Sequence, residues 1–463
     1  MERRLHGFHR LALPAICATA LSLSCAPREA APPRNLLVIT LDTIRADHLG
    51  CHGYFRDTSP RLDAFARDAL FFTRCLAPIS TTLPAHVSLF TGVDPYEHGI
   101  LANPPRGENF DSSAGLTTLA EDLRAAGYRT AAFVSGAPLK RESGIGTGFD
   151  HFDQPDGAER RAGETNAAFF AWFTGAGGPG AAGQRDIPSF IWIHYYDPHA
   201  PYSPPAPFDS LYAPDTRLDA FLGARRMAYC AESSLSAREA AGLYDGEVRY
   251  MDEQIGLLLD RLEQEGWLRE AAVVIVGDHG EGLCQHGMMG HGHIFGEQLH
   301  VPLMMRVPGE APRRIETLCS LIDVLPTLAG RMPGLPGPAV LAQASGTDVL
   351  APGPAREGLL ARNSALDERR SGGVVHALTT GQWKYVETED EDRQLHDVAR
   401  DPYELTDSAD RFPGESARLS SAMRALIAWQ QNRRQAFRRA PSDSTRALSP
   451  EMIEQLRSLG YVD

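Results

Sequence analysis

The sequence predicts an α/β protein in which a mainly parallel sheet is covered by helices on both faces, followed by a smaller C-terminal subdomain with an antiparallel sheet. Two observations predict the first part: apolar runs of strand length recur along the chain, and amphipathic helical patterns separate them. Two stretches joined by the acidic turn ETEDED (387–392) predict the second part. A chain of 463 residues that is 43% hydrophobic can bury a large core.

Five apolar runs are predicted as buried strands because each has strand length and little polarity. They are NLLVITL (35–41), TAAFVS (130–135), SFIWIHY (189–195), AAVVIVG (271–277) and VPLMMRVP (301–308). A helix is predicted at 117–127, where Thr118 and Glu121 form a capping box and a glycine closes the segment. A second helical pattern runs from Leu235 to the terminating Gly266.

Changes in composition predict the domain boundaries. Residues 26–34 (APREAAPPR) read as a proline-rich tether, and residues 35–340 as the main α/β domain. A segment rich in proline, glycine and alanine at 338–358 predicts a seam, so that 341–463 forms the C-terminal subdomain. Within it, GGVVHALTTGQWKYVE and RQLHDVA predict antiparallel strands, and 415–434 predicts a helix.

Residues 1–25 predict an export signal, because arginines precede an apolar run that is too short to span a bilayer. The ending LSLSC resembles a bacterial lipoprotein signal, with Ser22 in place of the usual leucine. Cys25 would then be lipidated; the alternative is an ordinary cleaved signal. We therefore expect an exported protein, either periplasmic or anchored at the bacterial envelope through an N-terminal lipid alone.

Charge and cysteines narrow the kinds of partner. The formal charge of −14 is spread along the chain, without the basic face that nucleic acid needs or the polybasic run that anionic lipid needs. The cysteines downstream of Cys25 are scattered and odd in number, with no CxxC spacing. We expect them to be isolated thiols or to include one pair, but not to form a metal cage. The expected partner is a small-molecule or glycan ester.

Polar residues follow three of the predicted strands directly. Asp42 follows NLLVITL, HYYDPH (194–199) follows SFIWI, and Asp278 with His279 follows VVIVG. Because the carboxyl ends of strands share one rim in open α/β sheets, we expect these residues to meet. Two carboxylates and an imidazole suit a divalent cation, which lowers the pKa of an oxygen nucleophile bound to it.

The stretch TTLPAHVSLFTG (81–92) predicts an anion site next to that cation. Pro84 suits the first turn of a helix, which places Thr82 beside free backbone N–H groups and the positive end of the helix dipole. Such a terminus accepts a tetrahedral anion. By itself the threonine reads as a helix cap; beside the metal cluster, it reads as a nucleophile.

With these pieces the chain resembles the sulfatase family within the alkaline phosphatase superfamily. The matching segments are NLLVITLDTIRADHLGCHGY, TTLPAHVSLFTG, DPHAPYSPP, VGDHGEGLCQHGMMGHGHIFGEQLHVPL, SLIDVLPTLAG, WKYVE and QLHDVARDPYEL. The resemblance runs from about residue 34 to the C-terminus and implies that family's mixed, mainly parallel sheet flanked by helices. The segment 35–340 is then the sulfatase-like catalytic domain.

The resemblance implies roles for particular residues. Asp42, Asp278 and His279 match metal ligands, and Thr82 matches the nucleophile that also touches the metal. His86 stands where the family has an arginine that supports the nucleophile.

Four further residues match positions that handle the substrate. His199 matches the histidine that handles the proton of the leaving group. His291 and His293 match a Lys/His pair that contacts the substrate's oxygens, and Asn103 matches an asparagine that lines the site. His194, which ends an apolar strand, is predicted as a framework residue instead.

Departures from the family pattern shift the expected substrate. Sulfatases carry two adjacent aspartates where this chain has Asp42 and Thr43, and they convert a cysteine or serine to formylglycine. Thr82 cannot take that route, so no formylglycine is expected, and a threonine ester must be cleaved by a second attack. That chemistry favours phosphate monoesters, diesters or phosphonates over sulfates. Histidines at 86 and 291, which can be neutral, favour a less densely charged substrate.

The sequence thus predicts an exported hydrolase of sulfate or phosphate-type esters that uses one divalent metal ion. The family resemblance implies Ca²⁺, whereas an imidazole ligand suits Mn²⁺ or Zn²⁺. Two alternatives remain open: a transferase that moves a phospho-substituent onto envelope glycans or lipids, and a catalytically degenerate sulfatase-like binding protein.

Overall fold

The computed structural model describes residues 33–104, 109–112, 115–213, 215–224, 236–332, 335, 337–352, 356–365 and 367–437. The predicted export signal with Cys25, most of the tether and Cys230 lie outside the described residues. No helix among these described ranges is both long and apolar enough to cross a membrane.

A nine-stranded mixed sheet forms the main body, with the strand order β10-β2-β9-β6-β1-β5-β3-β4 and β11 paired with β2. Its strands are β1 (Asn35–Leu41), β2 (Leu70–Leu76), β3 (Arg129–Phe133), β4 (His151–Asp153), β5 (Ser189–Tyr195), β6 (Ala271–Gly277), β9 (His300–Arg306), β10 (Arg313–Ile315) and β11 (Cys319–Ser320). All pairs are parallel except those of β9, which runs antiparallel to both β2 and β6. The predicted mixed, mainly parallel sheet is confirmed.

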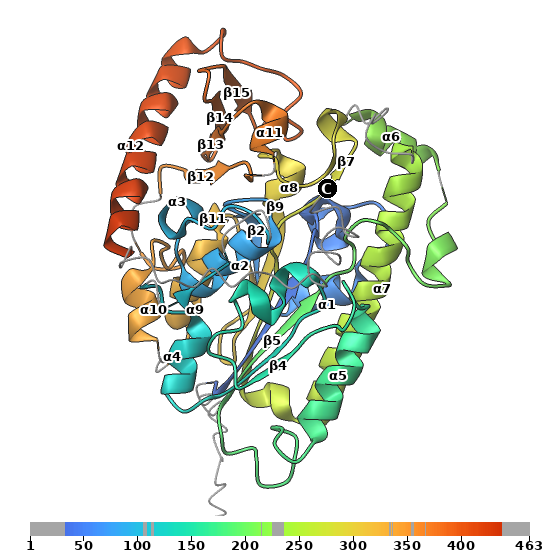
Figure 1. The fold of residues 1–463 in the computed structure, drawn as a ribbon. Helices are drawn as coiled ribbons and strands as arrows, with labels where there is room; N and C mark the ends of the chain where they lie inside the picture. Colours follow the sequence, from blue (N-terminus) through green and yellow to red (C-terminus); the bar gives the residue numbers. More distant parts are fainter. Residues whose placement is uncertain are drawn as a thin grey trace, which may run out of the picture. The chain divides into compact units, whose positions relative to one another are not determined.

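Helices cover both faces of this sheet (Figure 1). Leu37 and Ile39 of β1 pack in a core with α1 (Pro60–Arg67), α5 (Ala162–Thr174), α6 (Thr216–Ala224) and α7 (Ala237–Gln264). Leu36 and Val38 point the other way, into a core with α2 (Thr82–Thr91), α4 (Leu119–Ala125), α9 (Val324–Ala329) and α10 (Pro338–Gln343). Because both faces are buried, β1 is apolar throughout and shows no alternation.

The predicted capping signals begin two of these helices. Thr118 accepts a hydrogen bond from the backbone N–H of Glu121 at the start of α4, and Glu121 reaches back to close the capping box. The long helix α7 starts with the same device at Ser236 and Glu239. It ends before Gly266, whose φ of 71° lies in the left-handed region that favours glycine.

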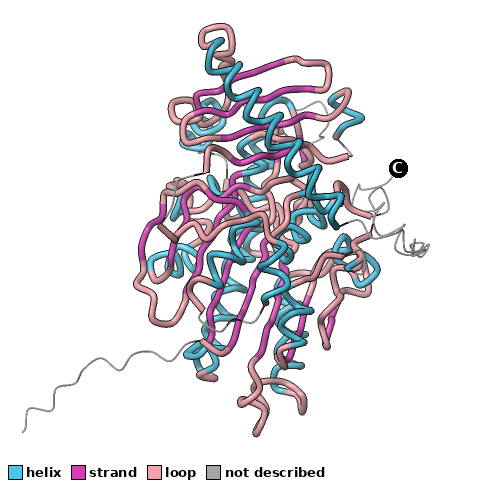
Figure 2. The backbone as a smooth tube through the Cα atoms, turned by 90° about the vertical axis from the view of Figure 1, so that its left-hand side faces the viewer, coloured by secondary structure: helices cyan, strands magenta, loops and turns pink. Residues whose placement is uncertain are grey.

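The C-terminal part contains a four-stranded antiparallel sheet in the order β12-β13-β14-β15 (Figure 2). Its elements are β12 (Leu359–Arg362), β13 (Val375–Thr379), β14 (Trp383–Thr388), β15 (Arg393–Asp397) and α12 (Pro413–Phe437). Leu378, Tyr385 and Leu395 of the sheet pack with Leu419 and Met423 of α12 in a separate small core. The antiparallel prediction is confirmed, and the predicted helix at 415–434 lies within α12.

The smaller elements are α3 (Pro95–His98), α8 (Gly296–Leu299), α11 (Glu368–Ser371) and the two-stranded pair β7 (Gly282–Leu283) and β8 (Met289–Gly290). Backbone hydrogen bonds continue past the central strands: Asp42 N–H donates to Tyr195 O (2.9 Å), and Asp278 N–H donates to Leu41 O (3.2 Å). These bonds fix Asp42 and Asp278 side by side at one edge of the sheet, here called the rim. The polar ends of β1, β5 and β6 therefore meet as predicted.

Candidate active site

Asp42, Asp278 and His279 form a buried group at the rim whose ligand atoms all lie within 4.8 Å of one another. His279 Nε2 lies 3.8 Å from Asp42 Oδ1 and 3.6 Å from Asp278 Oδ2. The other ring nitrogen of His279, Nδ1, lies 3.0 Å from Gly280 O. A hydrogen bond from Nδ1 to that carbonyl leaves the lone pair of Nε2 facing the two carboxylates, the arrangement that a metal-binding histidine needs.

The two carboxylates of this group are poorly compensated by the protein. Asp42 Oδ1 and Asp278 Oδ2 are buried and accept no hydrogen bond from the described residues. Burial raises the pKa of both carboxyls well above the usual range, and the charge of Asp42 raises the pKa of Asp278 further. Buried oxygens of this kind are satisfied by a cation, so the residues present fit a divalent metal ion.

Thr82 lies at the first position of α2, and its hydroxyl is in contact with the group formed by Asp42, Asp278 and His279. Its Oγ1 is 3.3 Å from His279 Nε2, and the side chain is completely buried. Asn103 holds this end of the helix, because its Oδ1 accepts from Leu83 N–H (2.8 Å) and its Nδ2 lies 3.5 Å from Thr82 Oγ1. Thr81, not Thr82, is the N-cap residue, and neither hydroxyl makes a capping bond.

His86 lies one turn after Thr82 and faces Asp278. Its Nδ1 is 2.8 Å from Thr82 O and 3.6 Å from Asp278 Oδ2, and its Nε2 is 3.0 Å from the Thr40 hydroxyl. Burial and the neighbouring His194 lower the pKa of His86 well below its usual value. The ring is therefore neutral at pH 7 and supplies none of the positive charge of the arginine that the resemblance implies for this position.

His194, predicted as a framework residue, lies closer to the metal group than that prediction implied. Its Nε2 is 3.3 Å from Asp42 Oδ2, and together with His86 and Asp278 it forms a second group that could hold a metal. Burial lowers the pKa of His194 to about 3. A histidine inside the apolar run SFIWIHY was the sequence signal for this contact, since a buried imidazole needs a partner.

Two of the predicted substrate histidines face each other beside Thr82. His199 Nε2 and His291 Nε2 lie 3.4 Å apart, while the Nδ1 atoms lie 2.5 Å from Ala200 O and 3.0 Å from Ser80 O, respectively. The ring of His291 also packs on that of His279, with centroids 4.4 Å apart. The rings of His199, His291 and His279 thus form a continuous row that ends at Thr82.

His293 is turned toward the C-terminal part of the chain. Its Nδ1 lies 2.7 Å from Asp367 Oδ2, and its backbone N–H donates to Gln298. The described contacts of its ring are with Asp367 and Phe295, and its backbone carbonyl accepts a hydrogen bond from the Ser80 hydroxyl. Contact of the His293 ring with the substrate stays a prediction.

Glu281 is a buried acid near the rim that the sequence reading did not single out. Both of its carboxylate oxygens are buried without a hydrogen bond from the described residues. Burial raises its pKa well above the usual range, and the charges of Asp42 and Asp278 add to the effect. The sequence feature that could have indicated Glu281 is its position in DHGE, two residues after the predicted metal ligand His279.

Fold and site together define an α/β protein with a candidate metal centre at the carboxyl ends of its central strands. The family model described as Sulfatase matches residues 34–335. The chain belongs to the sulfatase family.

Similarity to individual relatives is moderate. The chain is 29% identical over 255 residues to choline-sulfatase of Rhizobium meliloti (strain 1021), an alignment that covers 50% of this chain and 49% of that protein. It is 27% identical to arylsulfatase A of Homo sapiens over 79% of this chain and 76% of that protein. For arylsulfatase K of Rattus norvegicus the alignment covers 33% of that protein. The chain thus spans about half or less of the first curated relatives that it matches.

Solved structures share the fold. The phosphonate monoester hydrolase of Agrobacterium radiobacter superposes with a TM-score of 0.68 at 21% identity, covering 86% of this chain and 96% of that one. A 2-O GAG sulfatase gives a TM-score of 0.67 at 16% identity, covering 88% and 94%. At this level of identity the likeness concerns the architecture.

Proposed function

We propose that this protein is an exported, metal-dependent hydrolase of sulfate or phosphate-type esters in which Thr82 is the nucleophile. The observation that carries the proposal is the contact between the Thr82 hydroxyl and a buried ligand set of Asp42, Asp278 and His279. Membership of the sulfatase family supports the reaction class, and the names of the relatives include both sulfatases and a phosphonate monoester hydrolase.

The proposed metal ligands are Asp42, Asp278, His279 and the Thr82 oxygen. A divalent cation bound there would lower the pKa of the threonine hydroxyl and neutralise charge on the transferred group. Asn103 and the start of α2 orient the threonine oxygen toward the incoming ester. His86 fixes the backbone at Thr82 through the carbonyl of that residue and packs against Asp278.

His199 and His291 are proposed to manage protons. Attack releases the proton of Thr82, and the departing oxygen requires one. Because the Nε2 atoms of the two rings face each other at 3.4 Å, a single proton can be shared between them. Burial and the neighbouring His291 lower the pKa of His199 to about 3, so this ring is neutral at pH 7, and a proton that it takes from Thr82 passes on to the departing oxygen. In the second step, a water that attacks the Thr82 ester delivers its proton to the same pair, and the pair returns a proton to the departing Thr82 oxygen.

The charge of the site favours phosphate-type esters with a single negative charge. The rings that approach Thr82 are His279, His199 and His291, and burial lowers the pKa of the first two. A threonine ester also lacks the route by which a formylglycine hydrate expels sulfate. We therefore propose a phosphate diester or phosphonate monoester as a better substrate than an aryl sulfate.

A matched panel tests this proposal. The purified protein is stripped of metal and reloaded with Ca²⁺, Mn²⁺ or Zn²⁺. It is then assayed on four esters of 4-nitrophenol: the sulfate, the phosphate, the phenyl phosphate diester and the phenylphosphonate. The expected result is metal-dependent turnover that is fastest on the diester or the phosphonate. Turnover of the sulfate alone would contradict the proposed substrate class, and no turnover of any ester with any metal would contradict the enzymatic proposal.

A further inference from the structure

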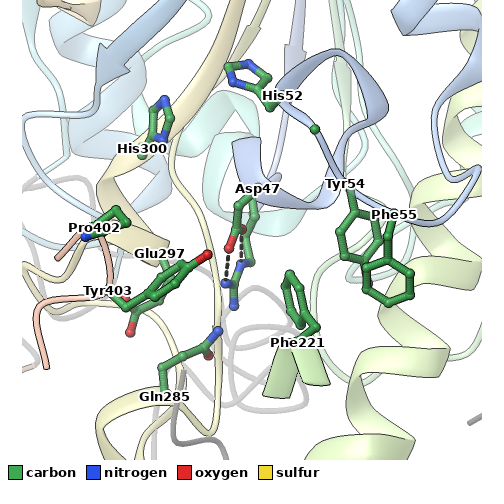
Figure 3. A pocket seen from close by; sticks show the side chains of 13 residues that line it. Asp47, His52, Tyr54, Phe55, Phe221, Gln285, Glu297, His300, Pro402 and Tyr403 are labelled. Carbon is green, nitrogen blue, oxygen red and sulfur yellow. Dashed lines mark hydrogen bonds and ion pairs between the residues drawn. The ribbon is translucent and has the colours of Figure 1, made fainter. Parts of the chain in front are cut away.

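A cavity of about 370 Å³ opens at the same rim but is built from different residues. It is lined by Arg45, Asp47, His52, Gly53, Tyr54, Phe55, Phe221, Gln285, Gly296, Glu297, His300, Pro402 and Tyr403 (Figure 3). None of these is among the residues proposed for catalysis. Its volume lies within the range of sites that bind small organic ligands.

The side walls of this cavity are aromatic. Tyr54, Phe55 and Phe221 form a packed trio with ring centroids 4.7–5.6 Å apart. Figure 3 shows Tyr403 and Pro402 on the opposite side of the cavity. The hydroxyl of Tyr54 is already bonded to Asp245 at 2.7 Å, so this residue offers the ligand its ring. Two facing apolar walls suit a flat ring inserted between them.

The charges that line the cavity are compensated within the wall. The guanidinium of Arg45 makes two bonds of 2.9 Å to the Asp47 carboxylate, and Glu297 lies 2.9 Å from His286 Nδ1. Burial opposes protonation of His286, but the hydrogen bond to Glu297 raises its pKa, so this carboxylate also has its partner within the wall. A sulfate or phosphate group would meet two carboxylates here and no unpaired arginine or lysine among the lining residues.

The remaining polar groups of the cavity are uncharged and call for hydrogen bonds. Burial and the neighbouring His300 lower the pKa of His52 to about 3, and burial lowers the pKa of His300, so both imidazoles are neutral at pH 7. Gln285 is 3% exposed, its Nε2 donates to no partner among the described residues, and Figure 3 shows that nitrogen facing the cavity. His52 Nε2 is likewise buried without a partner there. A purely apolar ligand would leave these groups unsatisfied.

We propose that this cavity binds a neutral, hydroxylated ring such as one sugar unit of a glycan. The C–H faces of a pyranose pack on aromatic side chains, while its hydroxyls bond at the edges to groups such as Gln285 Nε2, His52 Nε2 and the Asp47 carboxylate. Two kinds of ligand are therefore expected to bind at different places along the same rim. Anionic groups fit the metal centre, and uncharged sugar rings fit the second cavity.

Direct binding tests the proposal without any need for turnover. The full chain, stripped of metal, is titrated by calorimetry and saturation-transfer NMR with glucose, galactose, N-acetylglucosamine and lactose, and separately with choline and inorganic sulfate. At least one neutral sugar is expected to bind at a single site in the millimolar range, and choline and sulfate are expected to bind more weakly.

Variants locate the sugar. Gln285→Glu keeps the acceptor oxygen that Leu283 N–H uses but removes the amide donor, and Tyr403→Ala removes part of the opposite wall. Each is expected to weaken binding by about two- to tenfold, the range for one lost hydrogen bond or ring contact. Gln264→Glu, at an exposed position near the end of α7, is the matched control and leaves binding unchanged.

Three outcomes would overturn the proposal. No neutral sugar in the panel binds; choline or sulfate binds in preference; or binding persists in both cavity variants while Thr82→Ala abolishes it, which would place the sugar at the metal centre. Circular dichroism of each variant shows whether the fold is retained. Because Thr82→Ala leaves the cavity intact, failure of the proposed hydrolase leaves the sugar site standing.

Discussion

At the scale of single residues, the hydroxyl of Thr82 is the feature on which the proposed chemistry depends. It is buried, it lies 3.3 Å from His279 Nε2, and Asn103 holds the backbone beside it. A hydroxyl placed against a ligand set is activated when the site is loaded, whereas a methyl group in its place is inert.

Replacement of Thr82 therefore tests whether its oxygen reacts or whether the residue only supports the structure. Thr82→Ala is expected to lower kcat by at least about a thousandfold, and Thr82→Ser to retain turnover within about tenfold, because only the serine keeps an attacking oxygen. Intact-mass measurement during turnover should find an adduct on the peptide that contains residue 82. Alanine and serine variants of equal activity would show that the oxygen of residue 82 does not react.

Some contacts between single residues of the site could be predicted from the sequence, and others could not. Asp42, Asp278 and His279 could be placed together because each follows an apolar strand, and strand ends share a rim. The position of His293 could not be predicted in this way, since its partner Asp367 comes from the C-terminal part and no local pattern signals that pairing. For His194 the sequence indicated only that a buried imidazole needs a partner; that Asp42 is this partner depends on the register Thr40↔His194 between β1 and β5.

At the scale of elements, the C-terminal sheet supports the segment that carries His291. Lys384 of β14 is almost fully buried, lies 2.7 and 2.8 Å from the two oxygens of Glu404, and donates to the carbonyl of Ile294. Ser364 N–H donates to Gly292 O (2.8 Å), a second tie to the same segment. Residues 291–294 are thus held in place from outside the main sheet.

Lys384→Met tests this support. Removal of the ammonium group leaves the Glu404 carboxylate buried without its cation, which is expected to lower the free energy of unfolding by about 3–5 kcal/mol. Urea unfolding measures that loss, and kcat should fall as the His291 segment loosens. The double variant Lys384→Met/Glu404→Gln removes the stranded charge and should recover part of the stability. A double variant less stable than the single one would show that the buried charge is not the cause.

The short helix α3 gives a pH-dependent contribution to stability. Asp94 caps it by accepting from Tyr96 N–H (3.0 Å), and burial raises the pKa of Asp94 to about 7. Because the folded pKa lies above the unfolded value of about 4, its contribution is complete below pH 4 and is lost as the pH rises through 7.

Asp94→Asn keeps a capping oxygen but does not ionise. The free energy of unfolding of the wild-type chain should fall by about 4 kcal/mol more than that of the variant between pH 4 and pH 8. Denaturant unfolding at several pH values measures the difference. Parallel pH profiles for the two proteins would contradict a buried, titrating Asp94.

The strands of the main sheet could be predicted from the sequence, but the direction of one of them could not. The five predicted strands appear as β1, β3, β5, β6 and β9, because buried strands have continuous apolar runs. The direction of β9 was not predictable from its own residues, since an apolar run of that kind fits a parallel or an antiparallel neighbour equally well. It lies between β2 and β6, and those long-range partners set its direction.

At the scale of the whole molecule, the unpaired oxygens at the rim are expected to make the stability of the fold depend on a bound cation. A cation that binds the folded chain and not the unfolded one stabilises it by about 2.7 kcal/mol at a hundredfold excess over Kd. Chelation should therefore lower Tm, and re-addition of the preferred cation should restore it. Asp278→Asn should abolish the response, while the control Asn109→Asp, outside the rim group, should keep it. An unchanged Tm on chelation and reloading would argue against a cation in this position.

The most direct measurement is the location of the metal itself. Crystals grown with Mn²⁺ are examined by anomalous diffraction at the manganese absorption edge. We predict a peak about 2–2.5 Å from Asp42 Oδ1, Asp278 Oδ2 and His279 Nε2, with Thr82 Oγ1 in reach of the ion. A peak held by His86 and His194 instead, or no peak at the rim, would contradict this prediction.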